Sequence, residues 1–462
     1  MVNDAPRPVR IVILGGGFAG AYAAQSLERQ LRRLPAPGAL ITLIDRHNFF
    51  VFYPLLIEAG TGSLEPRHAV VSIRSFLRST RFRMAEVTGI DIQAGTVTCS
   101  LAETREIDTI PFDHLVIALG SVTRMTEMPG LQENAFQLKS LADAVALRDH
   151  AIEMLEVADG TDDAAARRSL LHFVVVGGNF SGVEVAGELD AFLRQAAKQY
   201  TGFSPADISI TLVEHSDRLL GALDPDLAEY ALKNLRSRGL TVLLKTGVVA
   251  VGPDFAQLST GAKISSRTVV WCAGVAPTPL TLALPVPRDE RGYIECERDL
   301  RVKGFDNIWA IGDCADNPGP DGKPYPATAQ HAVQQARHVG PNIARVLCGE
   351  PTRPCDIHTK GWLAAMGCRT GVARVMGLKI SGFLAWWLWR TVYLMKTPGW
   401  GRRVRVAIEW TLELFFRRDY VQLGVHLRER ATTQRAPGQT EMRCDGELAA
   451  KEAASAGAPG AA

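Results

Sequence analysis

The sequence predicts an α/β protein with two parallel-sheet domains of the same plan. A nearly continuous β-branched run, Val9–Leu14, leads directly into Gly15-x-Gly17-x-x-Gly20 and then into an Ala-rich stretch without a helix breaker. The same order of strand, glycine turn and helix returns at residues 173–184, and each unit is followed by a second strand that ends in an acid. These repeats predict two Rossmann-like dinucleotide-binding domains, and hence two bound nucleotides.

The first glycine turn has the chemistry of a phosphate site. Gly15 permits the tight turn, Gly17 lets the backbone approach a pyrophosphate, and Gly20 lets the helix pack closely on the strand. Asp45 ends the next strand, at residues 41–45, and is placed to accept hydrogen bonds from a ribose hydroxyl. A glycine turn without a ligand is the alternative, and the full succession of strand, turn, helix, strand and acid disfavours it.

The second glycine turn, residues 177–182, departs from the pattern at its centre, where Asn179 replaces the middle glycine. Asn tolerates left-handed backbone better than other non-glycine residues, so we expect the turn to survive, with the side chain crowding the pyrophosphate. Glu214 ends the partner strand and favours a free ribose 2′-hydroxyl, hence NAD over NADP. Arg218, four residues further on, could weaken that preference.

Length and composition give no reason to expect a nucleic acid or a metal. The 462 residues suffice for two or three domains, and the net charge is only +2. Eight cysteines are scattered without a C-x-x-C pair or zinc spacing, so we expect reduced thiols in the cytosol. Residues 1–8 leave no room for a signal peptide, and no apolar run approaches the ~20 residues needed to span a bilayer.

The connecting stretches carry further signals of a bound cofactor. Residues 46–83 contain aromatics, Pro54 and small residues, which suit a loop packed on a large flat ligand, although an ordinary hydrophobic loop fits equally well. Gly312–Asp313 follows a strand beside a predicted helix start, and would set a carboxylate and N–H groups against polar cofactor atoms. Elsewhere we expect strands near 85–92, 95–100, 112–120 and 269–274, a helix over 141–158 and a polar linker over 159–168.

Together these motifs resemble those of type II (non-proton-pumping) NADH:quinone oxidoreductases, over residues 9–425. The resemblance rests on both glycine turns, the Pro-Leu-Leu segment within residues 51–56 and an Ala-Gln-x-Ala-x-Gln motif at residues 329–334. It implies FAD contacts at Gly15, Gly17, Phe18, Ala19, Gly20, Asp45, Arg46, Pro54, Leu55, Val87, Ala118, Gly120, Gly312, Asp313, Ala329 and Gln330. It implies NAD contacts at Gly177, Gly178, Asn179, Phe180, Gly182, Glu184, Glu214, Ala273 and Gly274.

The resemblance also implies a domain plan in which one nucleotide domain interrupts the other. The FAD domain would occupy residues 1–145 and 286–375, and the NAD domain residues 146–285. A C-terminal membrane-binding or dimerisation region would follow over 376–428, and then a disordered tail over 429–462.

In such an enzyme NADH gives a hydride to FAD, and the reduced flavin passes two electrons to a membrane quinone. Gln330 and Gln334 are one helical turn apart and can offer hydrogen bonds to quinone carbonyls, or they are ordinary polar residues at a helix start. Glu184 and Glu188 have the same spacing; they relay a proton between the two sites, or they stabilise a helix dipole. Lys396 is a candidate for assisting quinone reduction.

Residues 381–420 predict two amphipathic helices separated by Pro398-Gly399. Their tryptophans and flanking arginines suit the interface of an anionic bilayer, and the tryptophans are Trp386, Trp387, Trp389, Trp400 and Trp410. A core or homodimer helix pair is the alternative. We therefore expect a peripheral protein on the cytoplasmic face of the bacterial inner membrane, with a possible homodimer.

Other classes share parts of this pattern. Dithiol–disulfide oxidoreductases and sulfide:quinone reductases need closely spaced cysteines, which the chain lacks. NAD(P)H:ferredoxin or rubredoxin-type reductases share the nucleotide motifs but do not explain the Trp-rich end. A non-catalytic, NADH-binding flavoprotein sensor stays open because of Asn179.

Overall fold

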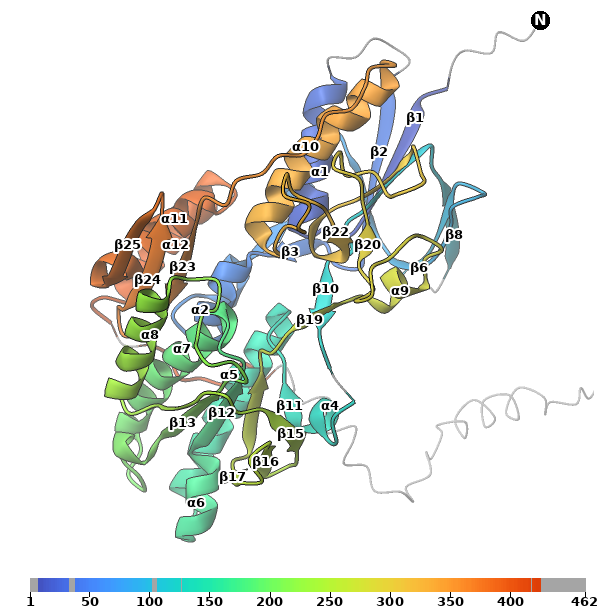
Figure 1. Ribbon diagram of the computed structural model, residues 1–462. Coiled ribbons are helices and arrows are strands. Elements are labelled where there is room, and N and C mark those ends of the chain that lie inside the picture. Colours follow the sequence, from blue (N-terminus) through green and yellow to red (C-terminus); the bar gives the residue numbers. More distant parts are fainter. Residues whose placement is uncertain (1–6, 33–37, 102–105, 126, 417, 425–462) are drawn as a thin grey trace, which may run out of the picture. The chain divides into compact units, whose positions relative to one another are not determined.

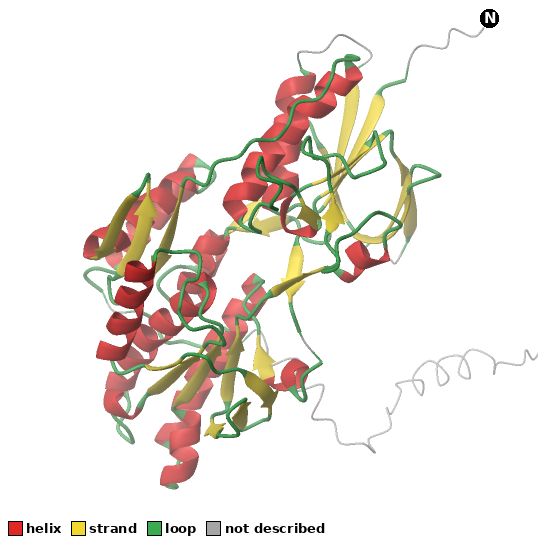
Figure 2. Ribbon diagram, in the orientation of Figure 1, coloured by secondary structure: helices red, strands yellow, loops and turns green. Residues whose placement is uncertain are grey.

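The computed structural model describes residues 7–32, 38–101, 106–125, 127–416 and 418–424 (Figure 1). The described residues up to Gln422 form one compact unit, and the fold described below is that of this unit. Figure 2 shows that this unit is built from both helices and strands. The tail expected to be disordered lies outside the described residues.

The first parallel sheet contains the first glycine turn. Its strand order is β21-β9-β1-β2-β5, so β21 joins beside β9 although β10 to β20 lie between them in the chain. Helices α1 (Phe18–Leu31) and α10 (Ala329–Leu347) pack together over this sheet. The strands are β1 (Val9–Leu14), β2 (Ala39–Asp45), β5 (Arg81–Met84), β9 (His114–Ile117) and β21 (Ile308–Ala310). An antiparallel sheet adjoins it, made of β6 (Glu86–Asp91), β7 (Thr96–Ser100) and β8 (Ile107–Pro111).

The second parallel sheet contains the second glycine turn, and its order is β11-β18-β12-β13-β14. These strands are β11 (Ala135–Phe136), β12 (His172–Val176), β13 (Ser209–Val213), β14 (Thr241–Leu243) and β18 (Thr268–Trp271). The accompanying elements are α5 (Leu141–Asp159), α6 (Ala164–Leu170), α7 (Phe180–Ala196), α8 (Pro225–Ser237), β15 (Val248–Val251), β16 (Phe255–Leu258) and β17 (Lys263–Ser265). The prediction of a polar linker over 159–168 was wrong beyond Asp163, because Asp163 caps α6.

Two strands, β10 (Ser121–Thr123) and β19 (Val275–Pro277), pair antiparallel where the chain passes from one sheet to the other and back. The fold-class prediction of two Rossmann-like sheets is confirmed. The remaining short elements are β3 (Phe49–Val51), η1 (Tyr53–Leu55), α2 (Leu56–Gly60), η2 (Pro66–Ala69), β4 (Val70–Ser72), α3 (Ile73–Phe76), α4 (Leu131–Asn134), η3 (Ala197–Gln199), η4 (Pro205–Asp207), α9 (Pro279–Ala283), β20 (Ile294–Glu295), η5 (Gly312–Cys314) and β22 (Ala315–Asp316).

The C-terminal region forms a three-stranded antiparallel sheet and two helices. Strands β23 (Gly361–Ala365), β24 (Gly371–Val375) and β25 (Leu378–Gly382) lead into α11 (Phe383–Lys396) and α12 (Trp400–Leu412). The two helices are separated at Pro398-Gly399, as the sequence predicts. Figure 1 shows this orange-to-red region beside the green helices α7 and α8. Within the described residues, no helix combines the length and the hydropathy needed to cross a membrane.

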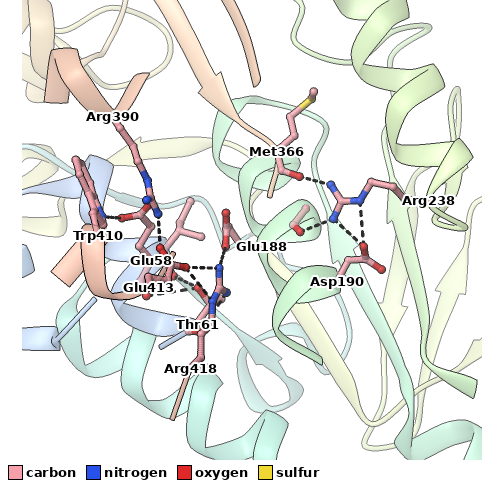
Figure 3. Close-up of polar contacts among 12 residues, drawn as sticks. Glu58, Thr61, Glu188, Asp190, Arg238, Met366, Arg390, Trp410, Glu413 and Arg418 are labelled. Atoms are coloured by element: carbon pink, nitrogen blue, oxygen red, sulfur yellow. Dashed lines mark hydrogen bonds and ion pairs between the residues drawn. The ribbon is translucent and has the colours of Figure 1, made fainter. Parts of the chain in front are cut away.

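A close approach between glycines holds the C-terminal sheet against α7. A Cβ atom on Gly187 would lie 2.1 Å from the Met366 carbonyl oxygen, and one on Gly367 would lie 2.1 Å from the Gly187 carbonyl oxygen. Arg238, at the end of α8, donates to both of these carbonyl groups and pairs with Asp190 (Figure 3). Helix α7 is therefore fixed to the C-terminal region through backbone contacts that side chains would prevent.

Candidate functional site

The first glycine turn leaves open space at its centre. Gly15 has a φ of +94°, and a Cβ there would lie 2.4 Å from the Ala118 carbonyl oxygen. A Cβ on Gly20 would lie 1.8 Å from the Gly15 carbonyl oxygen, whereas one on Gly17 would meet nothing within 4 Å. Gly17 is therefore free for the close approach of a ligand to the start of α1, which has no side-chain cap. This geometry fits the pyrophosphate of a dinucleotide.

Asp45 fixes the turn from the end of β2. One carboxylate oxygen accepts from the Gly16 N–H at 2.6 Å, and the other accepts from the His47 N–H at 2.7 Å. A carboxylate has about four acceptor positions, so two remain for ribose hydroxyls. Arg46, beside it, is exposed.

A second group of polar residues lies at the carboxyl edge of the same sheet. Asp313 accepts from the Ser121 hydroxyl at 3.2 Å, and the Lys139 ammonium donates to that hydroxyl at 3.3 Å. Burial raises the pKa of Asp313, which Lys139 opposes, and burial lowers the pKa of Lys139. The Gln335 amide oxygen accepts from the Gly312 N–H at 2.7 Å. Sequence reasoning missed both Lys139 and Gln335; Gln335 stood directly beside the noted glutamines.

The other residues expected to contact FAD fall at the same edge, with one exception. Val87 lies on β6 and pairs with Cys99 in the antiparallel sheet. The others sit at the β1–α1 turn (Phe18, Ala19), in η1 (Pro54, Leu55), after β9 (Ala118, Gly120), in η5 (Gly312) and at the start of α10 (Ala329, Gln330). Carboxyl ends of parallel strands are where such folds bind their ligands.

The second turn repeats the first, including its acid. Gly177 has a φ of +109° and lies against Ala273, and Gly274 also has a positive φ, of +75°. Glu214 accepts from the N–H groups of Gly178 and Ser216, the latter at 2.7 Å. Burial alone would raise the pKa of Glu214, but these backbone hydrogen bonds outweigh it and lower the pKa.

The expectation that Asn179 would adopt a left-handed backbone was wrong, whereas the expected crowding of a pyrophosphate stays a prediction. Its φ is −74° and its ψ is −176°, close to the −68° and −164° of Gly17, so this position needs no glycine for its backbone. The side chain folds back: its oxygen accepts from the Gly182 N–H at 3.0 Å, and its nitrogen donates to the Cys272 carbonyl at 2.7 Å. Asn179 therefore serves as the N-cap of α7. Arg218 is exposed and donates to the Gly221 carbonyl.

Helix α7 carries Glu184 and Glu188 to the junction with the C-terminal region. Glu184 accepts on Oε1 from the Ala365 N–H at 3.0 Å and from the Trp389 indole at 3.1 Å. Burial raises the pKa of Glu184 to about 8. Phe180, at the start of the same helix, stacks on Trp362 with ring centroids 5.3 Å apart.

Glu188 belongs to a buried ionic network that the sequence did not predict (Figure 3). Arg418 binds Glu188 at 3.2 Å and Glu413 at 2.9 Å, and Arg390 pairs with Glu413 and, at 3.5 Å, with Glu58. Burial raises the pKa of Glu58 to about 7, although Arg390 opposes that rise. We call Glu58, Glu188, Glu413, Arg390 and Arg418 the buried ionic network. It joins α2, α7, α11 and the segment after α12.

Gln330 and Gln334, which we expect near the quinone, form hydrogen bonds with the backbone of residues 358–360. The Gln330 amide oxygen accepts from the Lys360 N–H at 3.1 Å, and the Gln334 amide donates to the His358 carbonyl at 3.4 Å. The Lys396 ammonium lies 5.5 Å from the Tyr393 ring centre, and burial together with Lys360 lowers its pKa.

The two C-terminal helices turn their tryptophans mostly inward. Trp386, Trp389 and Trp410 are buried, so their assignment to a bilayer interface was wrong; only Trp387 and Trp400 are exposed. Glu409 of α12 also faces the protein: its carboxylate accepts from the Glu65 N–H and lies 2.9 Å from the His68 ring nitrogen Nδ1. The outward apolar residues are Phe383, Leu384, Trp387, Met395, Trp400, Val404, Ile408, Leu412, Leu414, Phe415 and Phe416. We call these residues the outer apolar face.

The two glycine turns and the acids that follow them define a protein with two dinucleotide-binding folds. Residues 9–336 match the pyridine nucleotide-disulphide oxidoreductase family, and residues 359–419 match the NDH2 C-terminal domain.

Curated relatives and solved structures agree. The chain is 30% identical to a type II NADH:quinone oxidoreductase of Mycobacterium tuberculosis, over 96% of this chain and 95% of that protein. It is 32% identical to a Staphylococcus aureus type II NADH:quinone oxidoreductase, over 81% and 91%. Its fold matches NDH2 from Plasmodium falciparum in complex with NADH, with a TM-score of 0.82 over 90% of this chain and 100% of that one, at 22% identity. The chain belongs to the type II NADH:quinone oxidoreductase family. The family and enzyme class predicted from the sequence are thereby confirmed.

Proposed function

We propose that this protein oxidises NADH and reduces a quinone, with FAD as its bound cofactor. The observation that carries the proposal is the position of Glu184. It lies on the helix that begins at the second nucleotide turn, and it is held by both β23 and α11 of the C-terminal region. A group placed there can serve both a nicotinamide and a quinone.

The first turn and its edge would hold the cofactor. Gly17 would meet the pyrophosphate, Asp45 the ribose, and Asp313 with Lys139 the polar atoms nearer the flavin ring. When bound, FAD supplies the two-electron chemistry that amino-acid side chains lack. We keep the domain division at residues 1–145, 146–285, 286–375 and 376–428 as part of this proposal.

The second turn would hold NADH. Glu214, buried and ionised through backbone hydrogen bonds, favours a ribose hydroxyl and would repel a 2′-phosphate. The Asn179 side chain is bound to the Cys272 carbonyl and to the Gly182 N–H at the start of its own helix. A sensor that binds NADH without turnover is the alternative, and steady-state NADH oxidation with a soluble quinone analogue distinguishes it from the enzyme.

The quinone would enter between the start of α10 and α11. Gln330, Gln334 and Lys396 come from these elements, and Glu184 reaches the same junction from α7. In this site Glu184 would provide a proton, and the amides and the ammonium would bind quinone oxygens.

The outer apolar face would rest on a membrane. Its aromatic and aliphatic side chains project outward while Glu409 of α12 points inward, which leaves the exposed Arg405 and the half-buried Arg402 and Arg403 to attract anionic lipid. This supports a peripheral protein on the cytoplasmic face of the inner membrane, where NADH is available. The alternative is that a second copy of the chain covers the outer apolar face in a homodimer.

Flotation with anionic vesicles tests the membrane part. The double variant Phe383→Ser/Phe415→Ser should lose vesicle binding at 0.15 M salt and keep turnover of a water-soluble quinone analogue. Met376→Ser, an exposed apolar residue in the turn between β24 and β25 rather than on the outer apolar face, is the matched control. Size-exclusion chromatography of the same variants shows whether the outer apolar face instead joins two copies in a dimer.

Anaerobic stopped-flow tests the activity: NADH should bleach a yellow protein faster than NADPH does, and quinone should restore the colour. Colour that NADH leaves unchanged would overturn the proposal.

A further inference from the structure

The two carboxylates of α7 receive different partners from the C-terminal region. Glu188 meets the guanidinium of Arg418 at 3.2 Å. Glu184, one helical turn earlier, accepts hydrogen bonds from two neutral donors of the described residues, the Ala365 N–H and the Trp389 indole N–H. A guanidinium holds a carboxylate in its charged form, whereas neutral donors leave it able to gain and lose a proton. The environments therefore assign the two acids different tasks.

Both donors to Glu184 end on the same oxygen, Oε1. A protonated carboxyl group carries its proton on one oxygen and keeps the other as an acceptor. The Trp389 indole can therefore hold Oε1 in both protonation states, while Oε2 carries the proton. Glu188 lacks this freedom, because the Arg418 N–H binds its Oε2 as part of an ion pair.

We propose that Trp389 is a positioning residue for quinone reduction, whose indole N–H fixes Oε1 of Glu184 so that Oε2 presents its proton to the quinone. The inference rests on the proposed function. Quinone reduction to quinol takes two electrons and two protons, and the hydride of NADH carries both electrons and one proton. The Oε2–H bond of Glu184 breaks to give the second proton to a quinone oxygen, and Glu184 then takes a proton from solvent.

The groups around Glu184 determine how its pKa changes when one of its hydrogen bonds is removed. Burial raises the pKa of Glu184 most, the hydrogen bonds from Ala365 and Trp389 oppose the rise, and the charges of Glu188 and Glu58 add to it. From α11, Tyr393 also faces Glu184, and burial raises the pKa of that phenol so that it stays neutral.

The cations nearest to these acids belong to other pairs. Arg418 binds Glu188 and Glu413, and Arg390 binds Glu58 and Glu413. Loss of the Trp389 hydrogen bond should therefore raise the pKa of Glu184 further.

The test compares Trp389→Phe with Trp410→Phe. Each change removes one indole hydrogen bond to a buried carboxylate, on Glu184 in the first variant and on Glu58, at 2.7 Å, in the second. The measurement is kcat of the FAD-loaded enzyme with a water-soluble quinone analogue from pH 6 to pH 10. In the wild type kcat should fall above about pH 8. We call this decline the alkaline limb of the pH profile, and Glu184→Gln should abolish it.

Trp389→Phe should move the alkaline limb upward by about one pH unit, because a hydrogen bond to a charged group favours the ionised form. Below the limb, kcat should fall ~3–10-fold because Glu184 is less well placed. Flavin reduction by NADH in anaerobic stopped-flow should keep its wild-type rate. Trp410→Phe should leave the limb where the wild type has it.

A second replacement covers the case in which Trp389→Phe binds no FAD. Benzothienylalanine at position 389 keeps the shape of the ring system and lacks the N–H, and it should produce the same upward shift. An unchanged limb in a folded position-389 variant, or an equal shift in Trp410→Phe, would overturn the inference. A wild-type enzyme that fails to reduce quinone would instead overturn the proposed function.

Discussion

Arg390 offers a direct test of the buried ionic network. Its guanidinium pairs with Glu413 and with Glu58 at 3.5 Å, and it lies over the rings of Trp386 and Trp410 at 4.5 Å and 4.8 Å. The perturbation is Arg390→Met, because methionine can fill the space between the two indoles without a charge. Glu413 keeps Arg418, whereas Glu58, which is 4% exposed, loses its guanidinium.

Removing one partner of a buried ion pair costs ~3–5 kcal/mol of the free energy of unfolding. The cost should depend on pH. Burial raises the pKa of Glu58 to about 7 in the folded protein, above the value of about 4.3 for an unfolded Glu. Proton binding by Glu58 therefore stabilises the fold fully below the unfolded pKa, and this contribution is lost as the pH rises through about 7. Without Arg390 that pKa rises further, so the deficit should be larger at pH 8 than at pH 6.

The assay is denaturant unfolding followed by far-UV circular dichroism, at pH 6 and pH 8 and at one fixed excess of FAD. Arg390→Met/Glu58→Gln is the control, and it should recover most of the loss because no carboxylate is left buried without its cation. Equal deficits at the two pH values, or a double variant as unstable as the single one, would refute this reasoning.

Three other substitutions test the turns and the contact between α7 and the C-terminal sheet. Gly17→Val should give a colourless, folded protein, because its side chain would occupy the open space at the first turn; absorbance at ~450 nm after FAD addition measures this. Asn179→Gly should change KM for NADH less than about threefold and cost only a few tenths of a kcal/mol of stability, since Asn179 acts as a cap; a tenfold lower KM would support the crowding argument. Gly187→Ala should lower the melting temperature by several degrees, because its Cβ would lie 2.1 Å from the Met366 carbonyl oxygen; an unchanged melting curve would contradict the close approach.

The two nucleotide turns could be predicted from the sequence because their requirements are local. Each turn needs a buried strand, glycines that permit the turn, and an acid at the end of the next strand, all within about 35 residues of chain. Gly15, Gly17 and Asp45 can therefore be identified from the sequence. Lys139 and Gln335 could not be identified in this way. They reach the carboxyl edge of the first sheet from other parts of the chain, whose local sequence pattern does not indicate that contact.

The C-terminal helices show what the sequence pattern cannot predict. Periodicity shows that α12 has an apolar side and an acidic side, but it does not tell which side meets the protein. The structure turns Glu409 and Glu413 inward, toward His68 and the arginines, and leaves Ile408 and Phe415 outside. Trp389 and Trp410 likewise turn inward, because their indole N–H groups find buried carboxylates.

The sequence by itself determined the α/β class and the two dinucleotide units, since these follow from short-range periodicity and from glycine, and its motifs pointed to the family by resemblance. The tertiary structure decided the buried ionic network and the surroundings of Glu184, which join segments far apart in the chain. A buried charge is tolerated only where partners of opposite sign or hydrogen-bond donors reach it. Packing alone settles which partners those are.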